Sequence, residues 1–283
     1  MPKEDKKLAV SLMLLSSLSF AIMGLMVKFS GDIPVFEKVF ARNLISLFVA
    51  IIVLVKSSSR FFGKLENQKF LFLRSLLGLS GVALFFYAIH NMNLADSSML
   101  NKMSPFFVTI FASLFLKEKI TRRSILILVI VFLSVLLIVK PKLDFTILPA
   151  FAGLTSAACA GGAYTILRYL KDKEKPETIV FYFSLFSVIV MFPLMMINFV
   201  IPSLEEFFAL LGIGVFAGIA QILLTYSYRY GKASELSIYS YTNVVFSGVF
   251  GFVFMKEIPD ILSFVGITLI VVTSTYFYKW SKS

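Results

Sequence analysis

Long apolar runs separated by short polar links dominate the chain. Each run has about the length, near 20 residues, that an α-helix needs to cross the hydrocarbon core of a bilayer. Continuous apolar runs of this length are typical of membrane-spanning helices. The pattern predicts ten spans, over residues 8–29, 35–55, 70–90, 97–116, 124–139, 147–169, 178–199, 206–230, 234–254 and 261–279.

Two of the links are very short. Residues 91–96 and 231–233 each join apolar segments whose combined length is at least twice what one span needs. Both links must therefore be tight turns between antiparallel helices.

Composition supports a membrane protein and excludes several other classes. Of the 283 residues, 58% are apolar and 15% are charged, whereas soluble domains have roughly 45–50% apolar and about 25% charged residues. Ten spans leave too few residues for an appended catalytic or nucleic-acid-binding domain. The single cysteine, Cys159, and the single histidine, His90, argue against a disulfide framework, a metal site and histidine-dependent hydrolysis. We expect an all-α membrane protein with no catalytic residue, metal or cofactor.

The distribution of Lys and Arg predicts the orientation of the spans. With the N-terminus in the cytoplasm, 20 of the 27 basic residues fall at cytoplasmic positions, six fall outside, and Lys102 lies within the fourth span. An even number of spans then places both termini in the cytoplasm. We read residues 1–7 as a short basic lead into a retained first helix. The net charge of +11 is explained by topology signals, so no nucleic-acid partner is predicted.

An internal repeat divides the chain into two halves. At a constant offset of 139, residues 87–118 align with 226–257 and share seven identities, which include Ser98 with Ser237 and Lys117-Glu118 with Lys256-Glu257. The same offset carries the start of the first span onto the start of the sixth. Each half has five helices, so the second half is inverted; residues 1–143 and 144–283 are the predicted repeats of one integral-membrane domain. Inverted repeats of this kind are typical of transporters that work by alternating access.

Several short segments carry a family resemblance. They are 93–100 (NLADSSML) with its continuation through Ser104-Pro105 to 115–120, the echo of this stretch at 233–236 and 254–257, and 39–44 (VFARNL). The chain resembles the EamA family of the drug/metabolite transporter superfamily along its whole length. That family moves amino acids, nucleobases, cationic drugs and other metabolites, so the resemblance implies transport without specifying a substrate. The chain departs from the pattern at Val244, which stands where the first half has Pro105, so the two helices need not bend alike.

Polar residues within the spans are the candidate substrate ligands, because burying them in a membrane is costly. In the fourth span Ser98, Asn101 and Lys102 share one face, and the ninth span presents polar residues at equivalent positions. Packing between helices is the alternative role for each residue. The predicted substrate-binding set is Ser17, Tyr87, Ser98, Asn101, Lys102, Ser156, Tyr164, Gln221, Thr225, Tyr228, Tyr239, Ser240 and Asn243.

Charged residues bear on the mechanism. The first span has no acidic residue, whereas the small four-helix multidrug relatives of the superfamily use an acid there, so this resemblance argues against proton-coupled cation exchange. Lys102 either snorkels or pairs with Asp96, or it attracts an anionic group of the substrate. Arg74 is interpreted as a cytoplasmic anchor.

The leading hypothesis is a secondary transporter in the cytoplasmic (inner) membrane, acting as a monomer or homodimer within the lipid bilayer. Its substrate is predicted to be a small polar or zwitterionic, amino-acid-like metabolite. The alternative is an efflux carrier for cationic or aromatic drug-like compounds. A membrane-embedded enzyme and a non-transporting scaffold are weaker alternatives, because the sequence has no clustered Asp, His or Cys constellation and a scaffold leaves the repeat unexplained.

Overall fold

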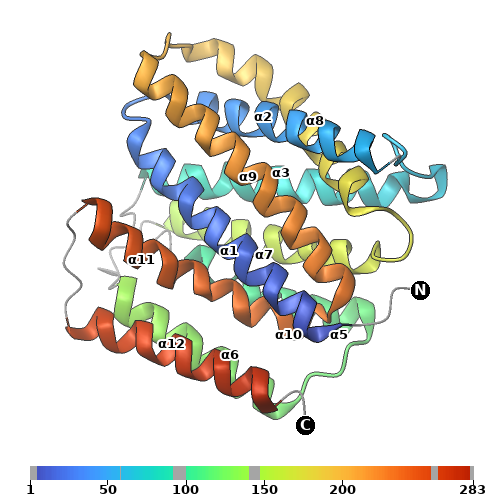
Figure 1. The fold of residues 1–283 in the computed structure, drawn as a ribbon, viewed down its shortest axis with the longest axis vertical. Helices are drawn as coiled ribbons and strands as arrows, with labels where there is room; N and C mark the ends of the chain where they lie inside the picture. The colour runs from blue at the N-terminus through green and yellow to red at the C-terminus, as the bar shows by residue number, and fades with distance from the viewer. Residues whose placement is uncertain (1–4, 58, 92–99, 140–146, 256–260, 281–283) are drawn as a thin grey trace. The chain divides into compact units, whose positions relative to one another are not determined.

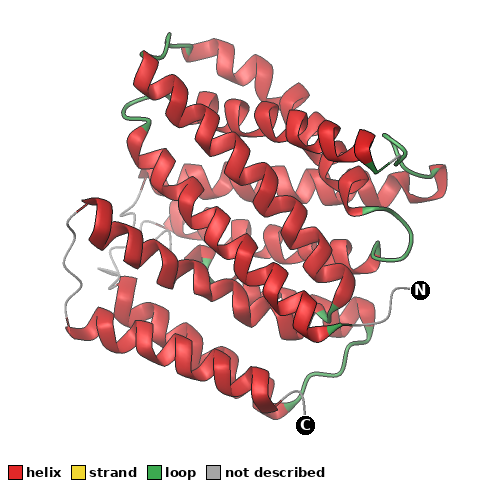
Figure 2. Ribbon diagram, in the orientation of Figure 1, coloured by secondary structure: helices red, strands yellow, loops and turns green. Residues whose placement is uncertain are grey.

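The apolar runs fold into α-helices close to their predicted bounds. The computed structural model describes residues 5–57, 59–91, 100–139, 147–255 and 261–280, and these residues form helices and connecting loops without a β-strand (Figure 2). The α-helices are α1 (Lys6–Phe29), α2 (Val35–Lys56), α3 (Gln68–Asn91), α5 (Ser104–Leu116), α6 (Arg122–Val139), α7 (Ile147–Tyr169), α8 (Pro176–Met195), α9 (Leu204–Tyr230), α10 (Ala233–Leu236), α11 (Thr242–Met255) and α12 (Ile261–Trp280), and the 3₁₀ turns are η1 (Leu65–Asn67), η2 (Met196–Asn198) and η3 (Ser237–Tyr241).

Seven of the described segments are long and apolar enough to cross a membrane. They are Lys6–Val27, Val35–Lys56, Leu65–Phe85, Ile147–Tyr169, Pro176–Asn198, Leu204–Tyr230 and Ala233–Phe254. Shorter apolar helices accompany them at Ser104–Leu116 and Phe264–Thr273. The chain is therefore a multi-pass membrane protein whose described residues are all helical or in connecting loops.

Two predicted spans depart from a single regular helix. The fourth, 97–116, is interrupted before α5, which begins only at Ser104; residues 97–99 lie outside the described part of the chain. The ninth, 234–254, changes from α10 through η3 to α11. The short link at 231–233 is confirmed, because α9 ends at Tyr230 and α10 begins at Ala233. The other short link, 91–96, lies almost wholly outside the described residues.

The first of two compact units comprises Met1–Leu76 and Leu167–Tyr230. In this unit α1 runs alongside α9, and α2 packs against α8 and α9 (Figure 1). Small residues bring these helices close together. Ser46 Oγ donates to the carbonyl of Gly214 at 3.0 Å, and a Cβ atom at Gly214 would collide with Ile45. The core between α2 and α8 is apolar and includes Leu47, Ala50, Leu54, Val180 and Phe181.

The second unit comprises Leu77–Ile166 and Gly231–Ser283. In this unit α6 and α12 lie side by side (Figure 1). Glu118, two residues after the end of α5, binds the start of α10. Its carboxylate accepts hydrogen bonds from the backbone N–H groups of Ala233 and Ser234 at 3.3 and 3.1 Å. A carboxylate at a helix N-terminus satisfies free N–H donors there. Each unit thus combines segments from both predicted halves of the chain.

Candidate substrate-binding site

The interruption before α5 exposes polar backbone within an apolar region. Asn101 ends a helical turn, Lys102 and Met103 form a turn, and Pro105 sits in the first turn of α5. Proline has no N–H to donate and its ring clashes with the carbonyl four residues earlier, so a continuous helix through this point is disfavoured. The break leaves the carbonyl of Lys102 available to a partner outside its own helix.

The equivalent segment of the second half is interrupted without a proline. Over η3, hydroxyl groups donate to carbonyls three residues earlier: Ser240 to Ser237 at 2.6 Å and Thr242 to Tyr239 at 2.7 Å. Such side-chain bonds compete with regular helical bonding. Val244 therefore does not make this helix regular; the two segments are both interrupted, by different means.

Polar groups from the two interrupted segments meet in the second unit. Lys102 Nζ donates to Asn243 Oδ1 at 3.2 Å, and the Tyr241 hydroxyl donates to the carbonyl of Lys102 at 2.7 Å. Lys102 and Asn243 are half-buried, and Tyr241 is fully buried. Among the described residues, no carboxylate lies within ion-pair distance of Lys102. Asp96, the predicted partner, is outside the described residues.

Helix α7 adds a third polar group to this cluster. Asn101 Nδ2 donates to Ser156 Oγ at 3.3 Å, and that hydroxyl donates to the carbonyl of Gly153 at 2.6 Å. Two glycines permit the approach: a Cβ atom at Gly153 would lie 3.0 Å from Leu100, and one at Gly161 would lie 2.5 Å from the Cβ of Phe107. We define Asn101, Lys102, Ser156, Tyr241 and Asn243 as the lysine cluster.

The structure joins four of the predicted ligands and leaves the others apart. Asn101, Lys102, Ser156 and Asn243 belong to the lysine cluster. Tyr241 also belongs to it but is not in the predicted set, although it stands in the ninth span at the position equivalent to Lys102. The remaining predicted residues of the second unit are the exposed Tyr87, the half-buried Tyr164 and Ser240, and the buried Tyr239. Ser98 lies outside the described residues.

The other predicted ligands lie in the first unit. Ser17 and Tyr228 are buried, and Thr225 Oγ1 donates to the carbonyl of Gln221 in its own helix at 2.7 Å. Gln221 Oε1 accepts a hydrogen bond from Arg74 Nη2 at 3.0 Å. The Tyr228 carbonyl accepts one from Arg168 Nη1 at 3.4 Å.

Arg74, interpreted from the sequence as a cytoplasmic anchor, is instead buried within the first unit. Its side chain is 2% exposed, and the guanidinium carbon lies 3.9 Å from the centroid of the Phe183 ring. A guanidinium is planar and weakly hydrated, which suits it to stacking on an aromatic ring and to burial. We define Arg74, Phe183 and Gln221 as the arginine cluster.

The family is decided by a comparison with known protein families. The model of the EamA-like transporter family matches the chain twice, at residues 7–140 and 147–278. The chain belongs to this family. The resemblance predicted from the short segments is thereby confirmed, and the protein is a transporter and not an enzyme.

Relatives of this EamA-like protein are transporters in bacteria and animals. The chain is 36% identical to the pseudopaline exporter CntI of Pseudomonas aeruginosa over 269 residues, which are 94% of each chain. It is 30% identical to human solute carrier family 35 member G1 over 95% of this chain and 79% of the relative. A crystal structure of a protein 15% identical in sequence matches with a TM-score of 0.86 over 99% of this chain and 100% of the other, which shows a shared fold. A small-metabolite transporter is thus supported.

Proposed function

We propose that the protein is a ten-span carrier of two inverted five-helix repeats, with both termini in the cytoplasm, that works by alternating access in the inner membrane. The two tandem matches of one family model, displaced by about the predicted offset, support the repeat. Contacts support it too. Lys102 and Tyr241 are hydrogen-bonded and occupy equivalent positions, 139 residues apart, as expected for residues near a pseudo-two-fold axis.

A second pair of contacts also follows the offset. In the first unit Ser16 Oγ donates to the carbonyl of Ala220 at 2.8 Å. The equivalent positions are Thr155 and Gly81, and a Cβ atom at Gly81 would lie 3.3 Å from the carbonyl of the neighbouring Ser156 in the second unit. Equivalent helices of the two halves thus pack in similar ways, as a repeat requires.

The transported substrate in this proposal is a small polar or zwitterionic metabolite whose carboxylate binds Lys102. The observation that carries it is the half-buried ammonium group of Lys102, which contacts the Asn243 amide and is not neutralised by a carboxylate of the described residues. The hydrogen-bonded pair Asn101 and Ser156 adds an amide and a hydroxyl group from the residue next to Lys102 and from α7, and such groups suit the polar remainder of the substrate.

Interrupted helices are a recurring feature of transporter binding sites, because their free backbone groups and polar side chains coordinate substrates within the membrane. Export is the proposed direction, following the Pseudomonas relative. The alternative substrate class, cationic drug-like compounds, is less favoured, because a positive charge lies at the centre of the lysine cluster and repels cations.

The test measures substrate binding and then flux. Purified full-length protein is screened by thermal stabilisation with amino acids, each paired with the amine that lacks its carboxylate, and with nucleobases and quaternary amines. We expect stabilisation by compounds that carry a carboxylate. Lys102→Gln should weaken their binding by roughly 10- to 100-fold, because a hydrogen bond to a charged group contributes about 1.5–3 kcal/mol. Lys102→Arg should retain part of the affinity.

Lys119→Gln is the matched control, since Lys119 is exposed in the same unit and lies outside the lysine cluster. Stabilisation by the amines alone, or equal binding by Lys102→Gln and the native protein, contradicts the substrate assignment. If a compound binds tightly but the protein does not transport it into or out of liposomes, the proposal that the protein is a carrier is contradicted. Comparing flux with and without a proton gradient then tests coupling.

A further inference from the structure

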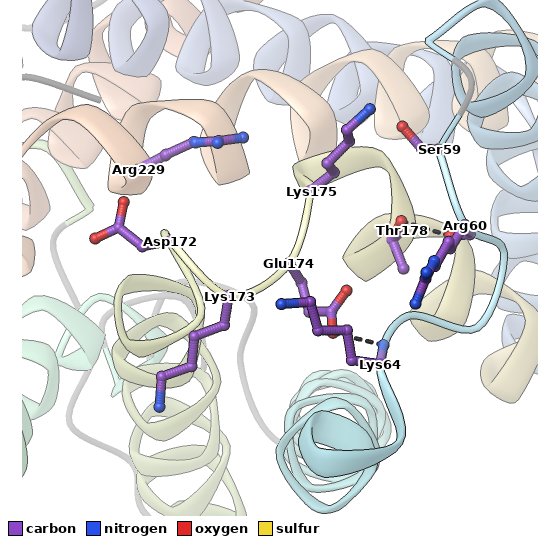
Figure 3. Close-up of a pocket in the computed structure, with 9 residues that line it drawn as sticks. All are labelled: Ser59, Arg60, Lys64, Asp172, Lys173, Glu174, Lys175, Thr178 and Arg229. Atoms are coloured by element: carbon purple, nitrogen blue, oxygen red, sulfur yellow. Dashed lines mark hydrogen bonds between the residues drawn. The ribbon is translucent and has the colours of Figure 1, made fainter. Parts of the chain in front are cut away.

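A cavity rich in basic residues lies at the loop end of the first unit, apart from the lysine and arginine clusters. Its volume is about 290 Å³. Figure 3 shows Arg229, from the end of α9, on one side of the cavity and Arg60 with Lys64 on the other. The lining residues are Ser59, Arg60, Lys64, Asp172, Lys173, Glu174, Lys175, Thr178 and Arg229. Five of them are basic and two are acidic, so the lining carries a net charge of +3.

Hydrogen bonds hold the cavity walls in place. Glu174 Oε1 accepts the Lys64 backbone N–H and Asn67 Nδ2, both at 2.7 Å, and Figure 3 shows its carboxylate turned toward the Lys64 backbone. Thr178 Oγ1 donates to the Arg60 carbonyl at 2.6 Å, and Lys175 Nζ donates to the Ser57 carbonyl at 3.0 Å. Residues 57, 60, 64 and 67 are thus each hydrogen-bonded to the segment 174–178 at the start of α8, and these bonds hold the cavity walls together.

The acidic residues of the cavity are already engaged. Glu174 is buried, and its carboxylate accepts the two hydrogen bonds just described. Asp172 Oδ2 lies 3.9 Å from Lys171 Nζ, within ion-pair distance. Lys173 is directed away, since its Nζ lies 3.5 Å from the centroid of the Tyr169 ring and Figure 3 shows its side chain pointing out of the cavity. Lys64 Nζ lies 3.8 Å from Glu66 Oε1, and Lys175 Nζ donates to the Ser57 carbonyl. The guanidinium groups of Arg60 and Arg229 are therefore the groups that a ligand would meet.

Arg229 carries a buried donor that needs an acceptor. Its Nε is inaccessible to solvent and has no hydrogen-bond partner among the described residues. Its backbone is held by Arg168, whose Nη1 donates to the Arg229 carbonyl at 3.3 Å. Buried donors are normally satisfied, and an anion bound beside the Arg229 side chain would supply the acceptor that its Nε lacks. Both Arg side chains line this cavity, and a guanidinium group suits phosphate oxygens because its N–H donors match their geometry.

Apolar side chains beside the cavity indicate where the phosphate comes from. In the connection between α2 and α3, Phe62 is 58% exposed and Leu65 is 92% exposed. Arg60, which precedes them, and Lys64, which lies between them in the sequence, line the cavity. Apolar and basic residues alternating at the end of membrane helices are typical of contact with the boundary between acyl chains and headgroups. We propose that this cavity binds the phosphoryl headgroup of an anionic phospholipid, with Arg60 and Arg229 as its main ligands.

The experiment follows the thermal unfolding of the purified full chain in an uncharged detergent. The added probes are short-chain phosphatidylglycerol, short-chain phosphatidylcholine, inorganic phosphate and glycerol 3-phosphate. We expect phosphatidylglycerol to raise the unfolding temperature more than the other three. Arg60→Gln should require about tenfold more phosphatidylglycerol for the same shift, and Arg60→Gln with Arg229→Gln should require still more.

Lys69→Gln is the matched control, because Lys69 is exposed in the first turn of α3 and does not line the cavity. It should leave the response nearly unchanged. Equal losses in Lys69→Gln and Arg60→Gln would mean a nonspecific charge effect and overturn the proposal, as would equal shifts with the two lipids. Inorganic phosphate or glycerol 3-phosphate matching phosphatidylglycerol would assign the site to a soluble anion and overturn the lipid assignment. Arg60 is exposed, so its variant tests the site even if Arg229→Gln disturbs folding.

Discussion

The two units each bring a cationic side chain to an amide oxygen, but they hold the cation in different ways. In the first unit Arg74 Nη2 donates to Gln221 Oε1 at 3.0 Å, and in the second Lys102 Nζ donates to Asn243 Oδ1 at 3.2 Å. In both pairs the cation comes from the first half of the sequence and the amide from the second. Arg74 is 2% exposed and stacked on a ring, whereas Lys102 is half-buried.

The backbone explains this difference. Arg74 and Gln221 project from the uninterrupted helices α3 and α9, whose main-chain groups are satisfied internally, so we expect the arginine cluster to pack helices. Lys102 and Asn243 lie where helices are interrupted, so their surroundings include polar backbone, which the proposed substrate could contact. The contrast between the two clusters supports the proposal that the substrate binds where the helix carrying the cation is interrupted.

The largest expected effect tests the structural role of the arginine cluster. Arg74→Ala removes a hydrogen bond, leaves Gln221 Oε1 unsatisfied and removes the packing on Phe183. We expect a loss of about 3 kcal/mol in unfolding free energy, measured as a lower unfolding temperature in detergent. Arg74→Lys should recover only part of it, because an ammonium cannot stack as a guanidinium does.

If Arg74→Ala keeps the native unfolding temperature and abolishes ligand binding, the arginine cluster is a substrate site and the contrast between the units is wrong. Transport measured per folded molecule separates the two readouts.

The next effect concerns the close helix contacts that support each unit. Gly161→Ala places a methyl group 2.5 Å from the Cβ of Phe107 and 3.0 Å from the backbone nitrogen of Val108. We expect a destabilisation of about 1–3 kcal/mol from overpacking, together with weaker substrate binding, because α5 must shift next to Lys102. Gly214→Ala, which meets Ile45 in the first unit, should destabilise similarly and leave binding intact.

Gly24→Ala is the control for these glycine variants, since nothing lies within 4 Å of the added methyl group. Alanine favours a helix over glycine by up to about 1 kcal/mol, so this variant should be neutral or more stable. Equal effects of Gly161→Ala and Gly214→Ala on substrate affinity would show that the link from α7 to the lysine cluster does not matter for binding.

The sequence alone predicted the helices well, because span length and hydropathy depend on local composition. The described helices α2, α7 and α9 lie within two residues of their predicted bounds. Part of the lysine cluster was predictable for the same reason: Asn101 and Lys102 are polar residues in an apolar run, and the repeat pointed to the matching segment near Asn243.

The rest depends on packing that no local pattern encodes. Arg74 lies near the predicted start of the third span, where an arginine is usually interpreted as a cytoplasmic anchor. Its partner Gln221 is 147 residues away in the sequence. The interruption over η3 contains no proline that would predict it from the sequence. It is accompanied instead by hydrogen bonds from the Ser240 and Thr242 hydroxyl groups to backbone carbonyls. The basic cavity required the fold as well, because its residues come from three separate stretches of the chain.

The smallest expected effect sharpens the role of the interrupted helices. Tyr241→Phe removes the hydroxyl that donates to the Lys102 carbonyl and leaves that half-buried acceptor without this partner. We expect a cost of about 1 kcal/mol, which appears as a roughly fivefold weaker binding of carboxylate ligands if the bond positions Lys102. Tyr276→Phe, at an exposed site on α12, should change neither stability nor binding. If Tyr241→Phe loses stability but binds substrate as the native protein does, the bond has only a structural role. The lysine cluster would then pack helices as the arginine cluster does, and the proposed difference between the two units would be wrong.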